Sequence, residues 1–160
     1  MWKRHITGTD PAKRFAGGLF LLTALAAPRA FPQAAEIPLQ VQGVHVVFFG
    51  PGRAERDSIA QSEGLEIDDL LDDFNLSAGK AAVYLSRNRI PSEFTECRIV
   101  IVKTGAGAPR TFDRRSIPDP VGMILTDGVH EPRIVPGRGT ERDLIREIRE
   151  YFHLREGTDE

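Results

Sequence analysis

The sequence predicts an α/β fold in which a small mixed β-sheet packs against two or three helices. Three observations support this class. Short apolar segments rich in Val, Ile and Phe recur along the chain, as in buried strands. One longer segment has apolar residues at spacings of three and four, which is typical of an amphipathic helix. Strand-like and helix-like segments are interspersed, as in layered α/β domains.

Three segments are predicted to be strands because each contains a bounded run of apolar residues, and the first, in which alternation precedes the run, is expected to be buried on both faces. They cover residues 39–50, 98–103 and 121–126. A turn at Asp127-Gly128 leads into residues 131–135, the expected hairpin partner of the third strand. Pro132 suits an edge strand, since proline cannot donate to a ladder. Residues 110–120 are expected to be irregular.

Helices are predicted over residues 53–63, over a central segment that Pro91 ends, and from Thr140 to about Leu154. Thr140 can cap the last of these, and acidic residues follow it where they favour the positive end of the helix dipole. The apolar stripe of the central helix consists of Ile67, Leu70, Leu71, Phe74, Ala78, Ala81, Ala82 and Leu85. This stripe is the clearest helical signal in the chain.

The N-terminus has the features of a secretory signal peptide. Four basic residues precede a run of 13 mostly apolar residues, and Ala24-Leu25-Ala26 provides small residues for cleavage. The run is too short to span a membrane, which takes roughly 20 apolar residues. We therefore expect residues 1–26 to be a cleaved signal, residues 27–39 an Ala/Pro-rich tether, residues 40–156 one domain, and residues 157–160 a disordered tail.

Cleavage at this site changes the formal charge from −2 to −5, because four basic residues and one acidic residue leave with the signal. An acidic surface of mixed charge gives no electrostatic footprint for nucleic acid. The expected location is the periplasm or the outside of the cell, with no stable membrane span after processing. The expected partner is another protein there.

Cys97 is the only cysteine, so the domain has no internal disulfide to stabilise it. Its position beside an apolar strand predicts a buried residue, because free cysteine is among the most buried residue types. The alternatives are a reactive thiol or a disulfide bridge to another chain.

The sequence predicts no catalytic residue, no metal site and no cofactor. Four aspartates begin the central helix, but calcium loops need oxygen ligands at alternating loop positions and a turn glycine. They are expected to form a solvated helix face, and they are Asp68, Asp69, Asp72 and Asp73. The histidines lack a metal-binding spacing, and the Gly-rich loops match no phosphate-binding motif. No nucleophile elbow of a hydrolase is present.

The candidate binding residues are Asp113, Arg114 and Arg115, together with Arg53. The first three lie in a polar segment between two predicted strands, where a rigid scaffold commonly carries binding residues. Adjacent arginines can hold a carboxylate or a phosphate through paired hydrogen bonds. Arg53 follows the Gly-Pro-Gly loop that ends the first strand. The alternative is a solvated loop with a local ion pair.

The order of elements from Ser116 onward resembles the C-terminal half of a thioredoxin-like domain. Ser116-Ile117-Pro118 precedes a strand, a turn, a second strand and a closing amphipathic helix. The resemblance implies a cis proline facing the site, at Pro118 or at Pro120. It also implies that dithiol exchange is lost, because Gly50-Pro51-Gly52-Arg53 stands where the family has C-x-x-C.

Three functions follow as hypotheses, of which the third is a small-ligand carrier with an apolar pocket. The first is a non-catalytic binding module for another protein, such as an envelope accessory factor, an inhibitor or an immunity factor. The alternative is a relative of thioredoxin-like oxidoreductases that uses Cys97 alone.

Overall fold

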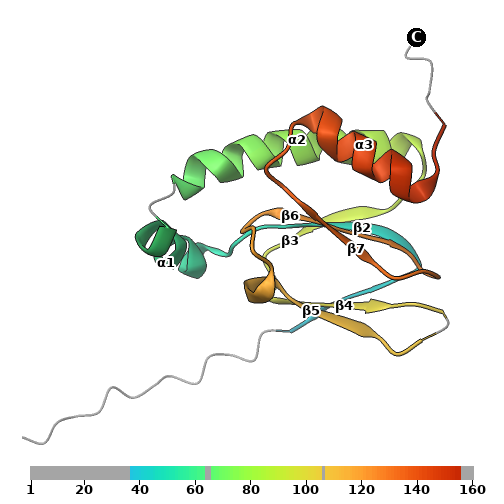
Figure 1. The fold of residues 1–160 in the computed structure, drawn as a ribbon, viewed down its shortest axis with the longest axis horizontal. Helices are drawn as coiled ribbons and strands as arrows, with labels where there is room; N and C mark the ends of the chain where they lie inside the picture. The colour runs from blue at the N-terminus through green and yellow to red at the C-terminus, as the bar shows by residue number, and fades with distance from the viewer. Residues whose placement is uncertain (1–36, 64–65, 106, 156–160) are drawn as a thin grey trace, which may run out of the picture. The chain divides into compact units, whose positions relative to one another are not determined.

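The structure is a computed structural model that describes residues 37–63, 66–105 and 107–155. The predicted signal peptide, the tail and most of the predicted tether lie outside these residues. The predicted α/β class is confirmed, with two small mixed sheets and three helices (Figure 1). No helix in the described ranges is both long enough and apolar enough to cross a membrane.

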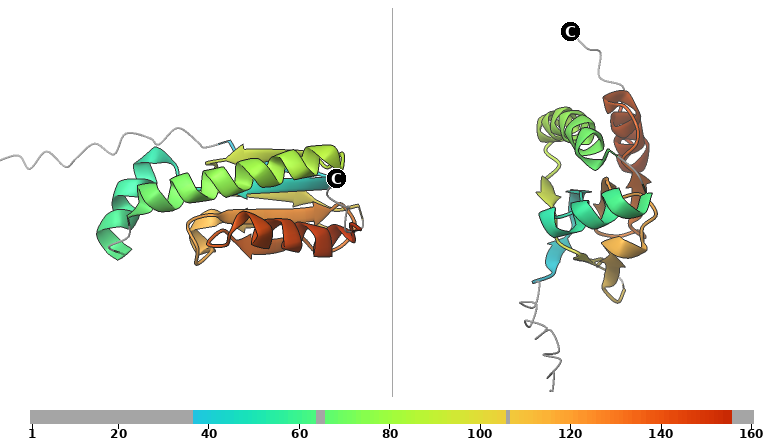
Figure 2. Two further views of the ribbon diagram at one scale, coloured as in Figure 1. Left: turned by 90° about the horizontal axis from the view of Figure 1, so that it is seen from above. Right: turned by 90° about the vertical axis from the view of Figure 1, so that its left-hand side faces the viewer.

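The elements form three layers. The middle layer is a four-stranded sheet in the order β3-β2-β6-β7, and a three-stranded sheet in the order β1-β4-β5 packs on one of its faces. Helices α2 and α3 lie side by side on the other face, with α2 above β3 and β2 and α3 above β6 and β7 (Figures 1 and 2). The strands are β1 (Leu39–Gln42), β2 (Val44–Phe49), β3 (Ser92–Thr95), β4 (Ile99–Lys103), β5 (Arg110–Asp113), β6 (Gly122–Asp127) and β7 (Arg133–Pro136), and the helices are α1 (Arg53–Glu63), α2 (Ile67–Arg87), α3 (Glu141–Phe152) and the 3-10 helix η1 (Arg114–Ser116).

Strand β2 holds the layers together because both of its faces are buried. Alternate residues of a strand point to opposite faces of the sheet. Val46 and Phe48 accordingly pack against the helices, and Val47 and Phe49 pack against the three-stranded sheet. All four are at most 1% exposed, which accounts for the unbroken apolar run in the sequence.

The prediction of one strand over residues 39–50 is wrong, since the segment forms two strands in different sheets. Gly43 separates them with a φ of +76°, a left-handed conformation that glycine adopts readily. β1 pairs with β4 in parallel, and β2 pairs with β3 and β6. Leu39, expected at the end of the tether, is the first residue of β1.

Two further strands differ from the prediction. Residues 110–120, expected to be irregular, contain β5 and η1, and β5 pairs with β4 in antiparallel orientation. Strand β3 had no sequence signal that distinguished it from a loop. Each of these strands lies at the edge of a sheet and contains a single apolar residue, so neither shows the alternation or the apolar run of a buried strand.

The helix predictions are confirmed. α1 and α2 have the expected positions, and six residues of the α2 stripe are buried. Thr140 caps α3 in a reciprocal arrangement, in which its hydroxyl accepts from the Asp143 amide while the Asp143 carboxylate accepts from the Thr140 amide. Strand β7 is the predicted edge partner of β6.

Two glycines that face each other should differ in their tolerance of substitution. Gly128 has a φ of +79°, and a Cβ there would lie 2.6 Å from the Cα of Gly43, whereas a Cβ on Gly43 would meet nothing within 4 Å. We expect Gly43→Ala to lose about 1 to 2 kcal/mol of unfolding free energy through backbone strain alone. Gly128→Ala should lose more, since a steric clash adds to the strain. Urea denaturation of both variants measures this, and equal losses would contradict the geometry.

Candidate functional site

Arg114 is a buried cation at the centre of the predicted binding segment. Its side chain is 6% exposed and donates hydrogen bonds to the Glu55 carboxylate, to the Cys97 carbonyl (3.3 Å) and to the Glu96 carbonyl (3.2 Å). The guanidinium therefore joins α1, the β3–β4 connection and η1. The sequence predicted that Arg114 is available to a ligand. Its contacts inside the protein instead give it a structural role, because it holds these three segments together.

Glu55 is the counterpart of Arg114 and the least exposed carboxylate of the site, at 18%. It also accepts from the Arg115 Nε (3.0 Å) and from the Gly52 amide (3.3 Å) at the first turn of α1. Burial raises the pKa of Glu55, but the hydrogen bonds from both arginines, the charge of Arg114 and the Gly52 amide outweigh it and hold the pKa below its usual value of 4.5. Glu55 is thus a charged carboxylate at neutral pH.

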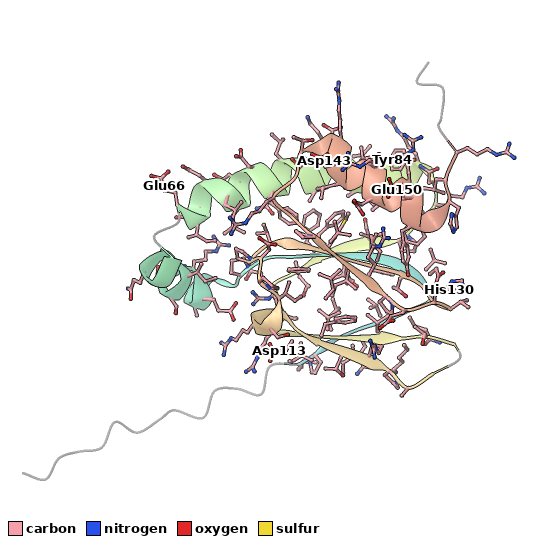
Figure 3. The ribbon with its side chains drawn as sticks, in the orientation of Figure 1. Glu66, Tyr84, Asp113, His130, Asp143 and Glu150 are labelled. Atoms are coloured by element: carbon pink, nitrogen blue, oxygen red, sulfur yellow. The ribbon has the colours of Figure 1, made fainter. Side chains whose placement is uncertain are left out.

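Asp113 is also held by internal contacts. It accepts three hydrogen bonds from the Nε and Nη2 groups of Arg98, the shortest 2.7 Å long, and it caps η1 by accepting from the Arg115 amide (3.0 Å). The Arg98 hydrogen bonds hold the pKa of Asp113 below its usual range. Figure 3 shows Asp113 beside η1 and His130 at the far end of the sheets.

A cleft of about 510 Å³ lies between α1 and the segment that follows β5. Three ionic side chains line it, together with a hydroxyl and several apolar groups. The lining residues are Ala54, Glu55, Ser58, Ile59, Arg114, Arg115, Ile117, Pro118 and Pro120. Arg115 is the accessible cation of this set, at 57% exposed. Its free surface and the apolar lining could together hold a side chain of a ligand.

The structure brings Arg114 and Arg115 together at the cleft and leaves Arg53 outside its lining. Arg53 is exposed at the first residue of α1. Sequence reasoning missed Glu55, Ser58 and Ile59, which α1 contributes. A signal was present, since Glu55 is the third residue of a predicted helix, where a carboxylate reaches back to the preceding backbone amide. Its pairing with arginines some 60 residues away had no local signal.

The implied cis proline is not found, because no cis peptide bond occurs in the described residues. Pro118 and Pro120 line the cleft with trans peptide bonds. Cys97 lies in the connection between β3 and β4 rather than in a strand, and it is half-buried instead of buried. It does not line the cleft, although its carbonyl accepts from Arg114.

The three histidines among the described residues lie apart from the cleft and from one another along the chain. His45 is in β2, with its Nε2 3.1 Å from Glu93 but without hydrogen-bond geometry, and His130 pairs with Asp127 in the turn after β6. His153 ends α3 with a φ of +53°. Within the described residues, no three His, Cys, Asp or Glu side chains are placed to hold a metal ion.

Comparisons of the chain with protein-family models, with curated proteins and with solved structures found no match.

Removing Arg114 should destabilise the protein far more than removing Arg115. Arg114→Met removes the buried partner of the half-buried Glu55 carboxylate, and loss of one partner of a fully buried pair, the upper bound here, costs about 3 to 5 kcal/mol. Arg115→Met removes an exposed ion pair, which is worth about 1 kcal/mol or less. Chemical denaturation of both variants provides the measurement. Similar losses would show that the Arg114 contacts do not brace the fold.

The contribution of Glu55 should depend on pH. Its pKa in the folded protein is below the usual 4.5, so its ionised form stabilises the fold fully above that value. The contribution should fall as the pH falls below 4.5, since the unfolded chain then takes up the proton first. We expect wild type to be more stable than Glu55→Gln at pH 7, with a difference that shrinks between pH 5 and pH 3. A constant difference in unfolding free energy would contradict this.

Proposed function

We propose that the protein is exported and acts as a non-catalytic binding module for another protein, which it contacts through the cleft beside α1. The observation that carries this proposal is the internally braced cleft itself. Arg114 and Glu55 fix its two walls to each other, and a rigid site loses less conformational entropy on binding. The secretory pattern of residues 1–26 supports the location, and the mildly acidic surface supports a protein partner over nucleic acid.

The lining of the cleft favours a particular kind of contact. Ile59, Ile117 and Pro118 offer apolar surface, and Arg115 has a guanidinium that is more than half exposed. Glu55 uses one edge of this guanidinium, so the remaining donors are available to a carboxylate. The segment we expect to bind therefore carries an apolar side chain next to an Asp or Glu.

Site-directed crosslinking tests this proposal in cells that export the protein. A photoreactive benzophenone residue replaces Ser58, which lines the cleft, and a matched variant carries it at Ser86, which is exposed on α2. We expect a discrete protein adduct from position 58 and none from position 86. Arg115→Gln should reduce the adduct at least tenfold, because it removes the charge-assisted contact.

Two controls separate this function from its alternatives. Arg142→Gln changes an exposed arginine on α3 and should leave the adduct unchanged. Cys97→Ser should also leave it unchanged, whereas an oxidoreductase that works through this thiol would lose its partner. The proposal is wrong if the adduct from position 58 is insensitive to Arg115→Gln, or if it depends on Cys97.

A further inference from the structure

Strand β3 presents an open edge. It pairs only with β2 among the described residues, where the Val46 amide donates to the Pro91 carbonyl (3.0 Å) and the Gly50 amide to the Thr95 carbonyl (3.2 Å). Hydrogen-bonding groups alternate in direction along a strand, so Ser92 and Phe94 direct their backbone amides and carbonyls away from β2. This edge can therefore accept another strand.

The side chains at this edge include an exposed aromatic ring. Phe94 is 51% exposed, and its ring stacks on the buried Phe48 with 5.0 Å between ring centroids. A hollow of about 280 Å³ adjoins it, between α2 and the end of β3, with Leu71 and Phe74 in its lining. A strand added to β3 would direct alternate side chains to the face of the sheet that α2 covers, where one apolar group could enter the hollow.

The mouth of the hollow is acidic. Glu96 lines it and is 64% exposed, and Asp68 at the start of α2 is 83% exposed. Asp72 follows one helical turn after Asp68 and is also exposed. Arg56 is the cation here, and it is shared between Glu96 (3.4 Å) and Asp68 (3.9 Å). Carboxylates outnumber cations at this end of the edge, while Arg89 lies near the opposite end of β3, in the turn that precedes it.

We propose that the open edge of β3 binds an extended segment of a partner protein in which an apolar side chain is flanked by Lys or Arg. The backbone of this segment extends the four-stranded sheet, its apolar side chain enters the hollow beside Phe94, and its basic groups face Glu96, Asp68 and Asp72. Charge disfavours a second copy of the chain paired in parallel, which would bring the same carboxylates together, whereas an antiparallel copy would bring Arg89 to this end, so self-association is a separate outcome of the test. The surface is separate from the cleft beside α1.

Two synthetic peptides, acetylated and amidated, test the proposal against the isotope-labelled protein in NMR titrations. The basic peptide is KTFTKT and the acidic peptide is ETFTET, so that they differ only in charge. We expect KTFTKT to bind at least tenfold more tightly than ETFTET and to weaken as salt is added. The Phe94 amide should gain protection from hydrogen exchange on binding, because it becomes part of a ladder.

Variants locate the binding. Phe94→Thr keeps a strand-forming residue but removes the ring, and it should weaken KTFTKT at least tenfold. Leu76→Thr changes an apolar residue of α2 outside the hollow that is more exposed than Phe94, at 64%, and should have no effect. Glu96→Lys should reduce the preference for KTFTKT over ETFTET. Absence of binding, equal affinity for the two peptides, or self-association that Phe94→Thr abolishes would each overturn the proposal, the last in favour of a second copy.

Discussion

The buried guanidinium of Arg114 is the constraint on which the arrangement around the cleft depends. A cation removed from water is stable only when a carboxylate and further acceptors surround it. Glu55 supplies the charge, and the carbonyls of Glu96 and Cys97 supply acceptors from a third segment. These contacts require α1, the β3–β4 connection and η1 to converge at one point. The cleft follows from this convergence, because its two walls carry the paired groups.

The same contacts limit what the site can offer to a ligand. Arg114 and Asp113 are committed to Glu55 and Arg98, so chemistry at the surface is left to Arg115 and the apolar residues of the cleft. Neither carboxylate is held in its neutral form, since the pKa of each is lowered by arginine. General acid catalysis near pH 7 needs a raised carboxyl pKa. Glu55 and Asp113 are therefore ionised partners of arginine near neutral pH and not proton donors.

The sequence predicts those parts of the fold that have a strong local period. The stripe of α2 and the cap of α3 are local patterns, and both were found as expected. Strand β3 was missed because pairing with β2, rather than its own composition, makes it a strand. The adjacent arginines were noticed, but no periodicity links Arg114 to Glu55. The role of Arg114 is set by burial, which residue type alone does not reveal.

The crossing of the chain at Gly43 has a consequence for how the protein folds. β1 and β2 are consecutive in sequence but join different sheets, so each needs a partner from much later in the chain. Among the strands of the described residues, only the β4–β5 and β6–β7 pairs connect strands that are close in sequence. Pairing between distant segments is slow because a large loop must close first. The two hairpins and α2 are thus the parts that can form early. The N-terminal strands β1 and β2 can pair only after their later partners in both sheets have formed.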